Sequence, residues 1–186
     1  MARGAGAANA AGVAGQRGCA YIGAMNGDTD LYDRDFVAWT EAQAAELRAA
    51  AAARVNLPID WEHLAEEIES LGKSDARALE NRLTTIIEHL LTLKWSPAMD
   101  PVAHWERTVA RGRGRVALIL RDSPGLRSRL SSMLNEAHAE ACKLAARELR
   151  TRGEITASEA EQLPLETFGL DEVLGEWWPE PRTARA

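Results

Sequence analysis

The segment DWEHLAEEIESLG at residues 60–72 carries five carboxylates and one histidine, side chains that hold divalent ions or transfer protons. In a helix, Glu67 lies on the flank of the apolar stripe, one turn from His63, whereas Glu66 and Glu69 face away from that stripe. We therefore expect Glu67 to be half-buried. A half-buried carboxylate needs a donor or a metal, because an unpaired interior charge costs several kcal/mol.

A basic segment later in the chain offers a partner for these acids. Residues 60–80 contain seven acids and two cations, whereas residues 106–129 contain seven arginines and two acids, so the segments carry about −5 and +5. In a helix, Arg113 falls inside the apolar sector with Glu106 beside it. We predict a buried pair between Glu67 and Arg113, at a polar centre made of Glu66, Glu67, Glu69, His89, Trp105, Glu106 and Arg113.

A metal site is the alternative for the same acids. Its ligands would be His63, Glu66, Glu67 and His89, and the arginines of the basic segment would clamp a phosphate in a metal-dependent hydrolase or nuclease. A di-iron bundle needs a Glu-x-x-His motif on each of two helices, and the sequence contains neither that motif nor HExxH. We expect no cofactor, with a divalent metal as the alternative, and no catalytic residue is assigned.

Two further site types have weaker motifs. The string ARGRGR at residues 110–115 leaves a nucleic-acid-associated module using Arg107, Arg111 and Arg115 as a third reading, although no aromatic residue is interleaved with these arginines. The sequence has no GxSxG, GxGxxG or GxxxxGK[ST] motif. Cys142 lies on an Ala-rich face, where we expect a small buried residue rather than a nucleophile.

Helical periodicity predicts the elements that position these residues. Cap residues and apolar stripes indicate about five helices, followed by a short C-terminal helical segment with a Trp177/Trp178 pair that we expect to plug the bundle. The expected helices begin at Asp33, Asp60, Ser74, Asp100 and Ser123 and end near Arg54, Gly72, Lys94, Leu120 and Arg152. Gly72 is predicted to terminate the second helix, and Gly112 to allow a close helix crossing.

Composition indicates one all-α domain. The 186 residues are 46% hydrophobic and 5% aromatic, rich in Ala, Leu, Glu and Arg, and carry a formal net charge of −6. We expect a disordered Ala/Gly-rich leader over 1–30, a helical domain over 31–179 and a loose tail over 180–186, with Met25 as an alternative start. Two cysteines and no apolar span predict a cytoplasmic protein without a membrane partner.

Several ordered motifs resemble the bacterial domain-of-unknown-function family twenty-nine. They are YDRDFVAW, DWEHLAEEIESLGKSDARALENRL, HLLTLKW, the Trp105-x3-Val109-x3-Arg113 spacing, DSPGL and LPLETFGLDEVL, and they cover about residues 31–179. The resemblance implies a compact all-helical bacterial domain and supplies no activity. The chain departs from similar proteins at His138, where they tend to have tyrosine. The leading prediction is a bundle that acts through binding to another protein or to itself.

Overall fold

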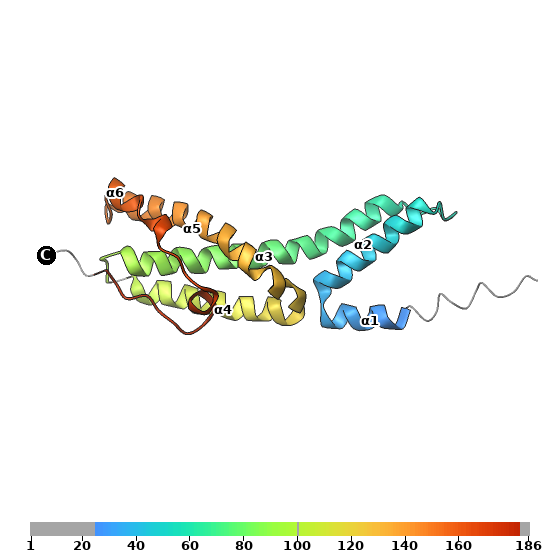
Figure 1. The fold of residues 1–186 in the computed structure, drawn as a ribbon, viewed down its shortest axis with the longest axis horizontal. Helices are drawn as coiled ribbons and strands as arrows, with labels where there is room; N and C mark the ends of the chain where they lie inside the picture. The colour runs from blue at the N-terminus through green and yellow to red at the C-terminus, as the bar shows by residue number, and fades with distance from the viewer. Residues whose placement is uncertain (1–24, 100, 183–186) are drawn as a thin grey trace, which may run out of the picture.

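The computed structural model describes residues 25–99 and 101–182, which form helices and no β-strand (Figure 1). The predicted all-α fold is confirmed. The helices are α1 (Met25–Arg34), α2 (Phe36–Ala52), α3 (Trp61–Trp95), α4 (Val102–Asp122), α5 (Leu130–Thr151), α6 (Ala157–Ala160) and α7 (Leu170–Leu174), with 3₁₀ turns η1 (Pro124–Arg129) and η2 (Leu163–Leu165). None of the described helices is long and apolar enough to span a membrane.

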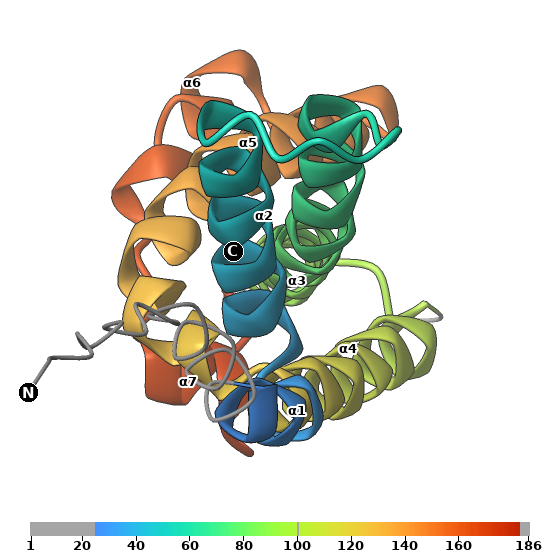
Figure 2. The same cartoon turned by 90° about the vertical axis from the view of Figure 1, so that its right-hand side faces the viewer.

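Helix α3 is the central element of two regions. Its N-terminal part, residues 61–76, packs against α2, and we call α2, the connection 53–60 and residues 61–76 of α3 the arm. The rest of α3 packs against α4 and α5, and we call this part, with the segments after α5, the bundle. Figure 1 shows the arm projecting beyond α4 and α5, and Figure 2, which views the arm end-on, shows α2 and α3 side by side.

The predicted helix boundary at Gly72 is wrong, because α3 continues through this residue as one helix of 35 residues. Gly72 is buried against α2, where an added Cβ atom would lie 2.1 Å from Thr40 Oγ1. The glycine therefore serves helix packing rather than helix termination. A glycine in a helix contact and a glycine at a helix end produce the same sequence pattern.

The bundle core is built on the predicted apolar stripe of α3. Six large side chains of α3 are fully buried, and they meet buried residues of α4 and α5. These six are Leu79, Leu83, Ile86, Ile87, Leu90 and Leu91. Each such side chain contributes about 1.5–3 kcal/mol to the free energy of unfolding. Buried residues of α4 and α5, among them Val109, Ala141 and Leu149, face the same core.

The junction between arm and bundle is fixed by hydrogen bonds from the corner before α2. Asp35, rather than the predicted Asp33, caps α2 by accepting from the Ala38 amide at 3.0 Å. Its second carboxylate oxygen accepts from the Gly125 amide, and Ser123 Oγ accepts from the Val37 amide at 3.3 Å. These contacts attach the start of the arm to the turn between α4 and α5.

Both chain ends differ from the prediction within the described residues. Helix α1 begins at Met25, inside the segment expected to be a disordered leader, while residues 1–24 lie outside the described part. At the other end, the Arg182 amide donates to the Lys94 carbonyl at 2.8 Å, and its guanidinium lies 4.0 Å from the centroid of the Trp95 ring. The tail is therefore anchored as far as Arg182. The predicted cap Asp100 and residues 183–186 are outside the described part.

Candidate functional site

Arg113 faces the C-terminal segment and not the acidic segment. Its Nε donates to the Val173 carbonyl at 3.0 Å, and its Nη2 donates to the carbonyls of Glu172 at 2.8 Å and Trp177 at 2.7 Å. The guanidinium carbon lies 4.8 Å from the ring centroid of Trp178. Burial lowers the pKa of Arg113, and the charge of Glu176 opposes that effect. The predicted pair with Glu67 is wrong, because backbone carbonyls satisfy this guanidinium.

Glu66, Glu67 and Glu69 of α3 lie in the arm, and none of them contacts Arg113. Glu66 and Glu67 are exposed, whereas Glu69 binds Arg48 of α2 at 2.8 Å and Lys73 at 3.3 Å. The hydrogen bond from Arg48, and then that from Lys73, lower the pKa of Glu69. Glu67 is not half-buried as predicted. The reason is that the small residues of α3, and not its leucines, face α2.

The four residues of the metal alternative do not come together. His63 and His89 lie on the same helix, separated along it by about 39 Å at a rise of about 1.5 Å per residue. His63 instead contacts Asp60, the cap of α3, with Nδ1 2.6 Å from Asp60 Oδ2, and this hydrogen bond raises the pKa of His63. No group of three or more His, Cys, Asp or Glu side chains in the described ranges is arranged to hold a metal ion.

His89 and Trp105 share a neighbour, Arg152 of α5, at one end of the bundle. His89 is half-buried and its Nδ1 has no hydrogen-bond partner among the described residues. Burial lowers the pKa of His89, and the nearby Glu148 carboxylate opposes this. Trp105 is buried, and the Arg152 guanidinium lies 5.5 Å from its ring centroid. His89 and Trp105 belong to the predicted polar centre, whereas Glu148 and Arg152 do not.

The residues of that cluster on α5 were missed. Glu148 and Arg152 form an ion pair one helical turn apart, and Glu148 also acts on Glu88, whose pKa is raised first by burial and then by this neighbouring charge. The i, i+4 spacing of the pair is visible in the sequence and could have indicated it. Glu106, which was predicted at the polar centre, is exposed on α4. The residues of the predicted polar centre therefore do not form one site: some lie in the arm and others in different parts of the bundle.

His138 and Cys142 lie one turn apart on α5 and serve packing between segments. The Nε2 atom of His138 meets the Glu166 carbonyl of the C-terminal segment. Cys142 is buried, and burial raises the pKa of its thiol. A thiol with a raised pKa is a poor nucleophile at neutral pH, because the thiolate is the reactive form.

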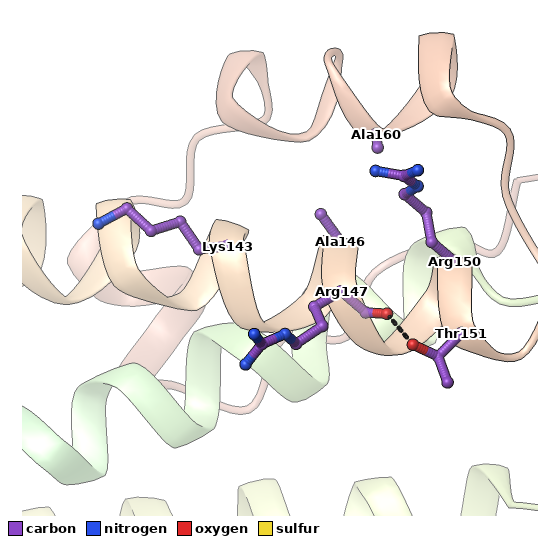
Figure 3. Close-up of a pocket in the computed structure, with 6 residues that line it drawn as sticks. All are labelled: Lys143, Ala146, Arg147, Arg150, Thr151 and Ala160. Atoms are coloured by element: carbon purple, nitrogen blue, oxygen red, sulfur yellow. Dashed lines mark hydrogen bonds between the residues drawn. The ribbon is translucent and has the colours of Figure 1, made fainter.

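A cavity of about 500 Å³ opens between α5 and α6. Its lining residues are Lys143, Ala146, Arg147, Arg150, Thr151 and Ala160. Figure 3 shows that the Arg150 side chain reaches toward Ala160, whereas Lys143 and Arg147 point in other directions. Lys143 is also paired with Glu140 at 3.0 Å. The cations of this cavity therefore do not converge on one ligand.

The arm carries an apolar row in which Leu64 and Leu71 are exposed, whereas Trp61 and Ile68 are half-buried. Trp61, Leu64, Ile68 and Leu71 recur at intervals of three, four and three on α3, and Leu64 and Leu71 are 41% and 50% exposed. The tip of the arm adds exposed Val55, Leu57 and Ile59. We call Trp61, Leu64, Ile68 and Leu71 the arm row. It was predicted to face the core, but Ala65 and Gly72 are the buried residues of this helix segment.

Residues 31–178 match the family described as domain of unknown function DUF29. The chain belongs to this family. Among solved structures, it is similar to an alpha-helical protein of unknown function from Rhodospirillum rubrum, with 26% sequence identity and a TM-score of 0.58. That match covers 78% of this chain and 89% of the other. Comparison with curated proteins gives no match. The resemblance stated from the motifs is confirmed, and the relatives supply a fold and no activity.

Proposed function

We propose that this DUF29 protein is a self-associating helical module in which the arms of two copies pair through the arm row. The observation that carries the proposal is the exposure of Leu64 and Leu71, two leucines of this row, on a helix that projects beyond the bundle. Contiguous exposed apolar side chains on a folded domain are typical of interaction sites. The intervals of the row are those of a coiled-coil seam, which supports a helix as the bound element.

The spacing of the row favours a second copy as the occupant. Because intervals of three, four and three read the same in both directions, a two-fold axis would place Trp61 beside Leu71 of the second copy, and Leu64 beside Ile68. The neighbouring positions Ala65 and Gly72 are small and covered by α2, so the flanks do not obstruct a second helix. The bacterial cytoplasm is the proposed setting, which the absence of a disulfide framework in the sequence supports.

Analytical ultracentrifugation tests the proposal. Leu64→Glu should raise the dissociation constant of the dimer at least about tenfold, because it replaces a buried contact by a charge at the interface. The folded monomer should be unaffected, since Leu64 is already exposed in one copy. Leu165→Glu, at an 80% exposed leucine of the bundle, is the matched control and should leave association unchanged.

The same measurement examines the two-fold geometry. Glu67 flanks the arm row near the proposed axis, so the two copies would bring like charges together. Glu67→Gln should therefore tighten the dimer by about twofold, whereas Glu66→Gln, on the other side of the helix, should not. A wild-type chain that sediments as a monomer at about 1 mM would overturn the proposal, because the binding free energy of such a dimer would be too small for a specific association.

The other readings of the sequence have less support. The hydrolase would need His63 and His89 at one ion, and their positions along α3 prevent that. The nucleic-acid module would need Arg107, Arg111 and Arg115 on one surface. These arginines recur at intervals of four and are exposed along one face of α4, but no aromatic side chain is interleaved with them on which a base could stack.

A further inference from the structure

A groove of about 240 Å³ runs where α3 packs against α4, on the bundle and apart from the arm row. Its lining residues are Arg82 and Thr85 from α3, and Thr108, Arg111, Gly112 and Arg115 from α4. Exposed arginines from both helices thus line the groove. One arginine comes from α3 and two come from α4.

Gly112 allows α3 and α4, the walls of the groove, to pack closely. It is buried, and an added Cβ atom would lie 2.7 Å from Ile86 Cγ1, so a larger residue would separate the two helices. The predicted close crossing at Gly112 therefore exists. Because the helix backbones approach here, side chains on either side of the crossing border one depression. Gly114, two residues later, has no atom within 4 Å of an added Cβ and makes no such contact.

The charges in the groove have no counter-ion in the described part of the chain. Arg82, Arg111 and Arg115 make no ion pair or hydrogen bond with another described side chain. Arg48, Arg121 and Arg129, by contrast, each have a carboxylate oxygen at 2.7 to 2.9 Å. Three positive charges therefore share one depression on a protein whose formal net charge is −6. Arginines that border one depression repel one another, and a bound anion would reduce that repulsion.

The chemistry of the walls selects the type of anion. Guanidinium groups donate paired hydrogen bonds that match the oxygens of phosphate. The Thr85 and Thr108 hydroxyls already donate to the carbonyls of Asn81 and His104, so the arginines would supply the donors to an anion. The lining residues include no aromatic side chain on which a nucleic-acid base could stack. The groove is also smaller than a typical drug-sized site. We propose that it binds the phosphate group of a small phosphate or phosphomonoester anion.

Isothermal titration calorimetry of the full chain with inorganic phosphate, at ionic strength held constant with sodium chloride, tests this site. We expect one phosphate per chain, and Arg82→Gln and Arg115→Gln should each weaken binding at least about fivefold. Arg107→Gln is the matched control, because this exposed arginine is on the same helix but outside the groove, and its binding should equal that of the wild type. Acetate at the same concentration should bind more weakly than phosphate.

Further probes distinguish the source of the phosphate and exclude a structural explanation. Glycerol phosphate that binds more tightly than inorganic phosphate identifies a phosphorylated small molecule, and equal binding identifies free phosphate. Without phosphate, Arg82→Gln should not lower the melting temperature, since it removes repulsion. The proposal is overturned if the groove variants bind phosphate like the wild type. It is also overturned if single-stranded oligonucleotide binds more tightly than phosphate and Arg107→Gln weakens that binding equally.

Discussion

At the scale of single residues, Arg113 shows how far helical periodicity predicts a site. The 100° rotation per residue correctly turned this side chain toward the interior, but it assigned the wrong partner. Charge matching considers side chains alone, whereas the acceptors here are three backbone carbonyls of a segment about sixty residues later. A carbonyl is present at every residue, so no sequence pattern distinguishes these three.

Arg113→Lys should destabilise the protein although it preserves the charge. A single ammonium cannot donate to the Val173, Glu172 and Trp177 carbonyls in the geometry of the guanidinium fork. We expect a loss of about 2 kcal/mol in the free energy of unfolding, the magnitude of a hydrogen bond to a charged group, measured by urea denaturation. Arg107→Lys is the control and should change stability by less than about 0.5 kcal/mol. An equal, small effect of both substitutions would show that Arg113 does not hold the C-terminal segment.

At the scale of elements, the buried face of the bundle helices was easier to predict than the helix boundary at Gly72 or the buried face of the arm. The stripe of α3 from Leu79 to Leu91 is apolar on a face wide enough to be read directly, and it is buried as expected. Gly72 was read as a helix end because its partner, Thr40, lies on a different helix. In the arm, the buried face is made of alanine and glycine and the exposed face of leucine, so hydrophobicity indicated the wrong side.

The two helical glycines Gly72 and Gly114 should respond in opposite directions to alanine. Gly72→Ala would place Cβ 2.1 Å from Thr40 Oγ1, so overpacking should outweigh the better helix propensity and lower the free energy of unfolding by about 1–2 kcal/mol. Gly114→Ala meets nothing within 4 Å and should raise it by up to about 1 kcal/mol. Thermal and urea denaturation would measure both.

The cause of the Gly72 effect can be isolated with a second substitution. Thr40→Ala removes the hydroxyl that the new Cβ would meet, so Gly72→Ala should cost less in that background than in the wild type. If Gly72→Ala stabilises the chain as much as Gly114→Ala does, α2 and α3 do not pack at the described separation.

At the scale of the whole molecule, the arm and the bundle should differ in local stability. In the arm, α3 is covered mainly by α2, whereas in the bundle it is covered by α4, α5 and the C-terminal segment. Regions with fewer buried apolar contacts open at lower free energy. Amide hydrogen exchange should therefore be faster for residues 61–72 than for residues 79–93 of the same helix.

Comparison within a single helix provides the control, since intrinsic exchange rates can be corrected residue by residue. The exchange of residues 61–72 should also slow as the protein concentration rises, because pairing of the arm row removes that face from solvent. Uniform protection along α3, independent of concentration, would contradict both the local difference and the pairing of arms.

Because α3 is one continuous helix, it also sets the direction in which the arm row faces. No break in α3 lies between Leu71 and Leu79, so the angular position of the exposed leucines depends on residue count, together with the contacts of Asp35 and Ser123 that attach α2 to the bundle. Each residue added or removed between these positions would rotate the arm row by about 100° around the axis of α3. In relatives of this chain, an insertion or deletion between these positions would therefore turn the arm row to a different side of α3, without changing the residues of the arm or of the bundle.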